Sequence, residues 1–319
     1  MTSDSESPPL KRQRTETGPV TRSEIWYDDG NVILQSENTL FRVHWSILSQ
    51  NSSFFRSLQG LPQPPEQPSI EGFPVIELPD TLPDVETLLR ALYYPTFLSK
   101  KRLQLSVLAA LIRLGRKYDF RDLLELAVER LIYENPPTLD GYMALSNPRY
   151  NMTCIESYTG VYFDIITLAR ENNILSVLPC AYYRAVLFSD QVFDGIEKKD
   201  GTSTSLAPID QRRCVLGRES VLKQRFRPGY TLAWLRTWDD HDDNCTAPSK
   251  CIKSRDELFR KYTVDDGRLL ALATFQLKGF CASCKGHANE AIVAGRKKVW
   301  EDLPGFFGLP PWDELKNDL

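Results

Sequence analysis

The chain has 319 residues, of which 42% are hydrophobic and 25% charged, a globular composition long enough to bury a core without disulfides or metals. Its 39 basic and 42 acidic side chains give a formal net charge of −3, which provides no electrostatic case for nucleic acid or membrane partners. Because no run of about 20 apolar residues is present, we expect no membrane span, and the polar N-terminus does not resemble a secretory signal.

Residues 1–22 are polar and lack a hydrophobic period, so we expect a disordered tail there. A compact basic cluster of Lys11, Arg12 and Arg14 lies within this segment. An exposed basic cluster is typical of a nuclear import signal, and a solvated run of charge is the alternative interpretation. The expected location is therefore the nucleus or the cytoplasm.

Three short segments rich in β-branched and aromatic residues follow the tail. They are residues 25–27, 32–35 and 39–43, separated by turn residues at Asp29-Gly30 and Glu37-Asn38. Because glycine adopts positive φ at little cost, Asp29-Gly30 predicts a tight hairpin. The three segments together predict an antiparallel start to a small sheet.

Apolar periodicity then predicts five helices and one further strand up to residue 135. The helices are expected at 44–48, 52–58, 82–92, around 108–112 with an end near Gly115, and at 123–131 with Asp119 as a cap, and the strand at 75–78. Five prolines between residues 62 and 74 predict a loop, because proline fits neither a helix interior nor a central strand.

Residues 138–319 have a mainly helical pattern. Helices are expected at 162–170, 178–188, 211–223, 256–262 and 267–277, and over a stretch that follows Cys281 and ends at Trp300. A polar segment at 198–207 predicts a flexible insertion. The apolar, proline-bound residues from Leu303 to Trp312 are expected to pack back onto this region.

The order and spacing of several short motifs carry a resemblance to a known family. The motifs are Asp29-Gly30-Asn31-Val32, Phe41-Arg42-Val43-His44, Ile47-Leu48-Ser49, Phe54-Phe55, Ile76-Glu77-Leu78, the helix with Leu88-Leu89, and Leu114-Gly115 with Lys117-Tyr118-Asp119. In this order, residues 23–135 resemble the BTB/POZ domain, with Asp29, Gly30, Phe41 and His44 as family motif residues. The rest of the chain, residues 138–319, is similar to the helical C-terminal region of fungal BTB proteins.

This resemblance implies a fold class and a kind of function. It implies an α+β domain, in which helices flank a small sheet, followed by a mainly α-helical C-terminal domain. BTB domains self-associate, commonly as homodimers, and many act as adaptors between a cullin-type ubiquitin ligase and a client. The client of residues 138–319 is unknown, and a nuclear transcriptional regulator or scaffold is the alternative. Trp45 departs from the basic residue that many relatives carry after the histidine, which argues against a charged ligand groove at Asp29.

The sequence gives little support for an enzyme. His44 lies alone at a strand-to-helix junction, where a histidine is usually packed and hydrogen-bonded. No nucleophile-elbow or phosphate-loop motif is present, so we expect neither catalytic residues nor a catalytic cofactor. An active site in the C-terminal half remains the remote alternative. Its material would be the cysteines and the acidic run Asp239–Asp243, which we interpret as a solvated loop rather than a metal site.

The seven cysteines are odd in number and accompany no export signal, so we expect reduced thiols. Cys281 and Cys284 form a CxxC pair, which can hold one Zn²⁺ if a second pair closes the site. The second pair would be Cys245 and Cys251, with His241 and His287 as alternates. A redox CxxC and ordinary buried thiols are the competing interpretations.

Aromatic side chains in the N-terminal region provide enough area for a protein-binding hot spot. They are Trp26, Trp45, Phe54, Phe55, Tyr93 and Tyr94. Burial of all six in the core is the alternative interpretation. The sequence therefore predicts a protein-interaction surface without assigning any one of these residues to it.

Overall fold

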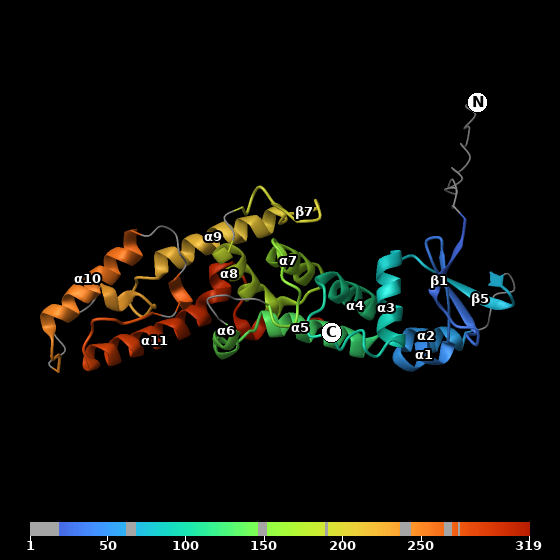
Figure 1. The fold of residues 1–319 in the computed structure, drawn as a ribbon, viewed down its shortest axis with the longest axis horizontal. Coiled ribbons are helices and arrows are strands. Elements are labelled where there is room, and N and C mark those ends of the chain that lie inside the picture. The colour runs from blue at the N-terminus through green and yellow to red at the C-terminus, as the bar shows by residue number, and fades with distance from the viewer. Residues whose placement is uncertain are drawn as a thin grey trace, which may run out of the picture. The chain divides into compact units, whose positions relative to one another are not determined.

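The computed structural model describes residues 19–61, 68–145, 152–188, 191–236, 244–264, 270–273 and 275–319. The chain divides into two compact units, and Figure 1 labels the helices and several of the strands. The N-terminal unit holds the chain up to Ser99 together with Arg113–Leu123, and the C-terminal unit holds Lys100–Ile112 and Leu124–Leu319. None of the helices in the described ranges is long and apolar enough to cross a membrane.

The N-terminal unit contains a mixed sheet in the order β1-β3-β2-β5-β4. Its strands are β1 (Thr21–Trp26), β2 (Val32–Ser36), β3 (Thr39–Val43), β4 (Ser69–Ile70) and β5 (Phe73–Leu78). β2 and β3 form an antiparallel hairpin, whose turn residue Glu37 has a φ of 52°. The central strand β2 is buried on both faces, because Leu34 faces one apolar cluster and Ile33 the other.

The first three strands were predicted to be antiparallel to one another, and this prediction is wrong for β1. β1 runs parallel to β3 and is not a neighbour of β2. Gly30 does not have a positive φ. A Cβ atom at Gly30 would instead lie 2.9 Å from the carbonyl oxygen of Val43 and 3.0 Å from that of Tyr27. The glycine therefore permits a close approach of backbones in the crossing from β1 to β2, rather than a hairpin turn.

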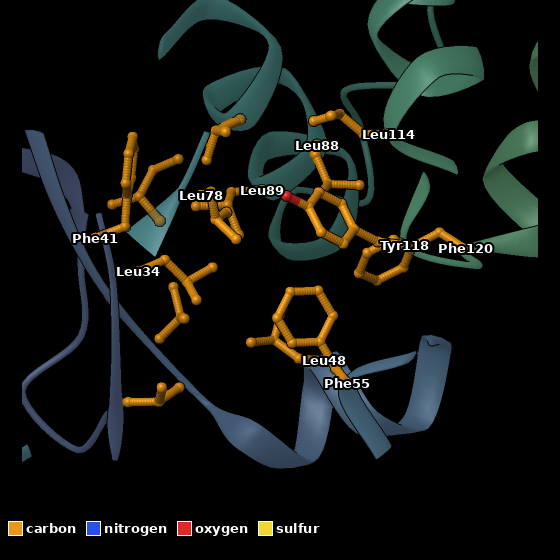
Figure 2. Close-up of a cluster of buried hydrophobic side chains, with 14 of the residues drawn as sticks. Leu34, Phe41, Leu48, Phe55, Leu78, Leu88, Leu89, Leu114, Tyr118 and Phe120 are labelled. Atoms are coloured by element: carbon orange, nitrogen blue, oxygen red, sulfur yellow. The ribbon is translucent and has the colours of Figure 1, made fainter. Parts of the chain in front are cut away.

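Helices pack beside this sheet around one apolar core. α1 (Trp45–Asn51), α2 (Ser53–Gln59) and α3 (Leu82–Tyr93) confirm the three helices predicted in this region. Figure 2 shows their side chains meeting those of the sheet and of residues 114–120. The buried core consists of Ile25, Val32, Leu34, Phe41, Val43, Trp45, Leu48, Phe55, Leu78, Val85, Leu88, Leu89, Leu114, Tyr118 and Phe120.

Two longer helices, α4 (Leu105–Lys117) and α5 (Arg121–Glu134), each contribute residues to both units. α4 continues two residues past Gly115, where we expected it to end. Its last turns are fixed to the N-terminal unit by ion pairs, one of 2.8 Å between Arg113 and Asp84 and one of 2.7 Å between Lys117 and Asp80. The sheet, α1–α3 and this end of α4 therefore belong to one compact unit.

The C-terminal unit is mainly helical, as predicted. Besides parts of α4 and α5 it contains α6 (Leu139–Leu145), α7 (Val161–Glu171), α8 (Leu178–Phe188), α9 (Pro208–Gln224), α10 (Pro248–Val264) and α11 (Ala282–Phe306), with 3₁₀ turns at Leu175–Val177, Ala233–Leu235, Leu270–Leu272 and Trp312–Glu314. α7, α8, α9 and α11 cover the predicted helices, and α6 was not predicted. α10 begins eight residues before the start that we expected.

Two predictions for the C-terminal unit are wrong. The segment 198–207, expected to be a flexible insertion, forms the turn and the second strand of a hairpin between β6 (Ile196–Glu197) and β7 (Ser203–Thr204), with Gly201 in the turn at a φ of 81°. The helix expected at 267–277 is reduced, in its described part, to the 3₁₀ turn Leu270–Leu272. The helix was predicted from apolar residues. Ala271, Leu272 and Leu277 are indeed buried, but without helical periodicity.

The C-terminal tail packs back onto this unit, as predicted. The ring of Trp312 stacks on Trp300 with centroids 5.3 Å apart, and its Nε1 donates to the Trp300 carbonyl oxygen. Asn317 accepts a hydrogen bond of 3.0 Å from the backbone N–H of Ser176. The last residues are therefore tied to α11 and to the 3₁₀ turn before α8 by specific contacts.

Candidate functional site

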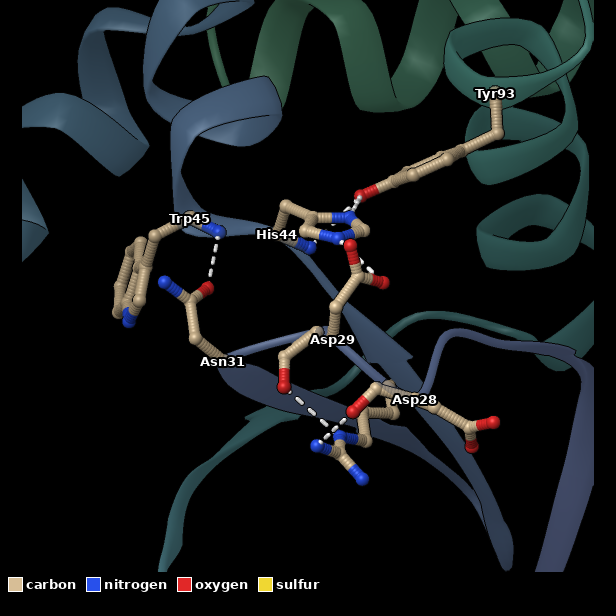
Figure 3. Close-up of polar contacts among 8 residues, drawn as sticks. Asp28, Asp29, Asn31, His44, Trp45 and Tyr93 are labelled. Atoms are coloured by element: carbon tan, nitrogen blue, oxygen red, sulfur yellow. Dashed lines mark hydrogen bonds and ion pairs between the residues drawn. The ribbon is translucent and has the colours of Figure 1, made fainter.

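The predicted motif residue His44 lies at the junction between β3 and α1. Its backbone N–H donates to the Tyr93 hydroxyl at 2.8 Å, and its ring Nδ1 lies 3.2 Å from the same oxygen (Figure 3). Its ring Nε2 lies 3.2 Å from Asp29 Oδ1. Burial raises the pKa of the Tyr93 hydroxyl to about 12, which keeps this group protonated at neutral pH.

Both ring nitrogens of His44 have a polar partner. Nδ1 lies within hydrogen-bond distance of the Tyr93 hydroxyl, which also accepts the backbone N–H of His44. Nε2 lies beside the Asp29 carboxylate. The histidine is thus a hydrogen-bonded junction residue, with both ring nitrogens occupied.

Other residues of the predicted motifs make contacts close to this junction. The Asn31 side chain accepts from the Trp45 N–H at 2.8 Å, which fixes the start of α1. The Arg42 guanidinium donates to the carbonyl oxygens of Gly30 and Asp28. Phe41 is fully buried in the core. Of the predicted motif residues, Phe41 is buried, Gly30 permits a close backbone approach, and Asp29 and His44 contact each other.

The six aromatic residues considered for a binding patch divide into buried and exposed members. Trp45 and Phe55 are buried, and Trp26 and Tyr93 are half-buried. Phe54 on α2 is 42% exposed, and Tyr94 at the end of α3 is 38% exposed. The exposed aromatic area of this set therefore comes mainly from Phe54 and Tyr94.

Four cysteines of the C-terminal unit converge at the N-terminal ends of two helices. Cys245 precedes α10 and Cys251 lies in its first turn, while Cys281 is the N-cap of α11 and Cys284 lies in its first turn. All four Sγ atoms lie within 4.8 Å of one another. The Cys245 and Cys281 sulfurs are 3.8 Å apart, and the Cys281 N–H donates to Cys251 Sγ at 3.2 Å.

The cluster fits the ligand set of a tetrahedral metal ion. Four thiolates about 2.3 Å from a Zn²⁺ ion lie about 3.8 Å from one another, close to the separations found here. The backbone N–H groups of Cys284 and Thr246 donate to the Cys281 sulfur and lower its pKa to about 6. Burial raises the pKa values of the Cys251 and Cys284 thiols, so these two are the thiols that a metal ion would most need to deprotonate.

The two cysteine pairs, Cys245 with Cys251 and Cys281 with Cys284, differ in their spacing and in their position relative to a helix. Cys281 and Cys284 are a CxxC pair that starts a helix, as in redox motifs, but Cys245 and Cys251 complete a set of four thiols. Five residues separate Cys245 from Cys251, more than in the CxxC pair. Cys245 can still reach the cluster because it lies in the loop before α10. His287, an alternate ligand in the sequence prediction, is exposed and is not part of the set.

A pocket of about 770 Å³ was not found by sequence reasoning. It is lined by the start of α4, residues 156–159 and the tip of the β6–β7 hairpin. Lys198 on its wall is bound to Asp164 at 2.7 Å, and the Tyr158 hydroxyl donates to the same carboxylate. These charges are therefore committed to holding the hairpin against α7.

Two segments considered in the sequence analysis lie outside the described residues. They are the basic cluster Lys11, Arg12 and Arg14, and the acidic run Asp239–Asp243, which includes the alternate metal ligand His241. The enzyme alternative depended partly on that acidic run. The other part of its material, the cysteines 245, 251, 281 and 284, is assembled as a potential metal-ligand set.

Comparison with protein families gives one match. The family model of the BTB/POZ domain matches residues 27–135, which contain β2–β5, α1–α5 and the His44 junction. No curated protein matches the chain.

Proposed function

Since residues 27–135 form a BTB/POZ domain, a protein-interaction domain without catalytic function, we propose that this chain is a non-enzymatic interaction module that self-associates as a homodimer. The observation that carries the proposal is the single apolar core shared by the sheet, α1–α3 and residues 114–120. It makes a rigid platform, on which partner surfaces can be presented without loss of conformational entropy.

Two features of this platform support self-association. β1 is one of the two edge strands of the sheet, and an edge strand can add a strand from another chain. The exposed ring of Phe54 contacts Phe55 and Tyr118 at centroid distances of 5.3 and 5.1 Å, so it is held in place before any partner arrives. Fixed, exposed aromatic rings are typical of binding hot spots.

Light scattering on the purified full chain tests the homodimer. A dimer has twice the chain mass of 36.5 kDa, and we expect that value at micromolar concentration. Phe54→Asp should lower the dimer fraction, whereas Val293→Asp, which places the same charge on exposed α11, should not. A mass of one chain over the accessible concentration range would refute self-association.

We further propose that the module works as an adaptor for a cullin-type ubiquitin ligase, with residues 138–319 holding an unknown client. Support comes from the chain architecture, in which a BTB/POZ domain precedes a second, mainly helical unit. Co-elution of the full chain with a purified cullin N-terminal region is the expected result. Stable dimers that never co-elute with a cullin would leave a scaffold as the function.

A nuclear regulator or scaffold without a ligase role is the second candidate, favoured by the basic cluster Lys11, Arg12 and Arg14. A tagged full chain should enter the nucleus, and replacing these three residues with alanine should shift it to the cytoplasm. Replacing Lys100, Lys101 and Arg102 removes the same charge elsewhere and should leave localisation unchanged. Identical cytoplasmic signal from all three proteins would end the import proposal.

We also propose that Cys245, Cys251, Cys281 and Cys284 hold one structural Zn²⁺ ion. The convergence of four sulfurs within 4.8 Å supports it, because structural zinc sites are closed by four protein ligands. Elemental analysis of chain purified without a metal-affinity step should give about one zinc per chain. Cys284→Ser should reduce the zinc content and Cys154→Ser, at a thiol outside the cluster, should not. Less than one tenth of a zinc per chain would refute the site.

A further inference from the structure

The four clustered cysteines differ in their access to solvent. Cys251 and Cys284 are each 1% exposed. Cys245 and Cys281 are partly exposed, and their sulfurs lie 3.8 Å apart. The cluster therefore has an inner pair and an outer pair, and each pair takes one thiol from the α10 side and one from the start of α11.

We propose that this cluster is a peroxide-sensitive switch, in which oxidation joins Cys245 to Cys281 and releases the metal. The proposal rests on the metal site proposed above. A small oxidant arriving from solvent meets an outer sulfur first, because the inner pair is covered by the apolar side chains of Trp234, Leu277 and Phe280. The neighbouring outer sulfur is then the accessible partner.

The chemistry balances with hydrogen peroxide as the oxidant. One outer thiolate attacks a peroxide oxygen, the O–O bond breaks, and a sulfenic acid forms with loss of hydroxide. The second outer thiolate attacks the sulfenic sulfur, the S–S bond forms, and a second hydroxide leaves. Two protons convert the hydroxides to water, two sulfur atoms are oxidised by two electrons in total, and the Zn²⁺ ion leaves without a change of charge.

The local structure allows this bond to form. An S–S bond is about 2.05 Å long, so the outer sulfurs must approach by roughly 1.8 Å. Cys245 lies in the loop before α10, outside the regular helix, and can supply that movement. The two inner thiols that remain are too few to hold zinc in a closed tetrahedral site, so disulfide formation and metal release are coupled.

The test uses the full chain with its metal bound. Zinc content is first measured by elemental analysis, and the protein is then treated with hydrogen peroxide in the presence of a chromogenic zinc chelator. We expect release of about one zinc per chain and a fall in the thiol count of the denatured protein from seven to five. Peptide mapping after alkylation should place the new bond between Cys245 and Cys281. The Cys154→Ser chain, which lacks the remaining partly exposed thiol, should release zinc equally well.

The other outcomes separate the switch from the metal site. Zinc at about one per chain that survives peroxide would overturn the switch and leave the metal site intact. Zinc release with a Cys251–Cys284 bond, or with sulfinic and sulfonic acids and no disulfide, would also overturn it. A purified chain that contains less than one tenth of a zinc would refute the metal site and, with it, the switch.

Discussion

At the scale of single residues, the Tyr93 hydroxyl is the central polar group at the junction between β3 and α1. It accepts the backbone N–H of His44 and lies within hydrogen-bond reach of the imidazole, which in turn contacts Asp29. The helix start at Trp45 is fixed separately by Asn31. One side chain of α3 thus fixes the end of β3, and the path of the chain into α1 depends on it.

Tyr93→Phe should therefore destabilise the domain. The change leaves the half-buried His44 N–H without its acceptor, which costs about 1–3 kcal/mol in the free energy of unfolding. Chemical denaturation followed by circular dichroism measures it. Tyr133→Phe removes a hydroxyl from an exposed tyrosine and should change stability by less than about 0.5 kcal/mol. Equal effects of the two variants would contradict the assigned role.

The same hydroxyl predicts a pH dependence. Its pKa in the folded chain is raised from 10.0 to about 12, chiefly by burial, so the folded state holds the proton more tightly than the unfolded state. The stabilisation is fully present below pH 10 and is lost as the pH rises through about 12. The difference in unfolding free energy between wild type and Tyr93→Phe should thus be constant below about pH 10 and shrink as the pH rises from about 10 towards 12. A constant difference over this range would count against the raised pKa.

At the scale of elements, α11 approaches its neighbours closely at one glycine. A Cβ atom at Gly295 would lie 2.4 Å from the backbone nitrogen of Thr231 and 2.6 Å from the Tyr230 carbonyl carbon. Both neighbours are backbone atoms, which cannot rotate away as a side chain can. The contact between α11 and residues 230–231 therefore depends on the absence of a side chain.

Gly295→Ala should destabilise the C-terminal unit, although alanine is the better helix former by about 1 kcal/mol. The helix must move outward to relieve the contact, and overpacking of this kind costs about 1–3 kcal/mol or more. Gly286→Ala is the matched control on the same helix, because no atom lies within 4 Å of its added Cβ. The control should be neutral or slightly stabilising in thermal unfolding. A neutral Gly295→Ala would show that this contact is looser than described.

The elements that sequence reasoning predicted best are those with one strong local signal. The helices expected at 52–58 and 82–92 from apolar periodicity correspond to α2 and α3. The parallel pairing of β1 with β3 could not be predicted, because Asp29-Gly30 matches a hairpin signal and only tertiary contact decides the partner. The 3₁₀ turn at 270–272 was missed because apolar composition alone does not separate a buried irregular segment from a helix.

Some features of the candidate sites could be predicted from the sequence and others could not. The four cysteines were selected correctly as a set, because thiol pairs are rare and their chemistry is specific. Their division into an inner and an outer pair depends on burial by residues distant in sequence, such as Trp234 and Phe280. The buried carboxylate of Glu134 was missed, although it accepts N–H groups of Thr153 and Cys154 at 2.5 Å. No local pattern marks a glutamate that serves a loop nearly twenty residues away.

At the scale of the whole molecule, both compact units have buried apolar side chains, and the C-terminal unit also contains the cysteine cluster. The N-terminal unit has a large apolar core between the sheet and the helices and a smaller apolar cluster on the other face of the sheet. Around the cysteines, the C-terminal unit has a smaller cluster, which includes Phe226, Trp234 and Phe280 and closes on Cys251 and Cys284. A bound metal ion would stabilise that cluster directly, because binding free energy at a site assembled by folding adds to folding free energy.

Removing the metal should therefore affect the two units differently. After treatment of the full chain with a strong chelator, amide hydrogen exchange in the first turns of α10 and α11 should rise by about tenfold or more, the equivalent of about 1.4 kcal/mol in local opening. Exchange in the β2–β3 hairpin should stay unchanged, because its protection comes from a core that contains no cysteine. Re-addition of Zn²⁺ should restore the original pattern. An equal rise in both units would show that the metal supports the whole chain, and no rise in either would show that the cysteine cluster is stable without it.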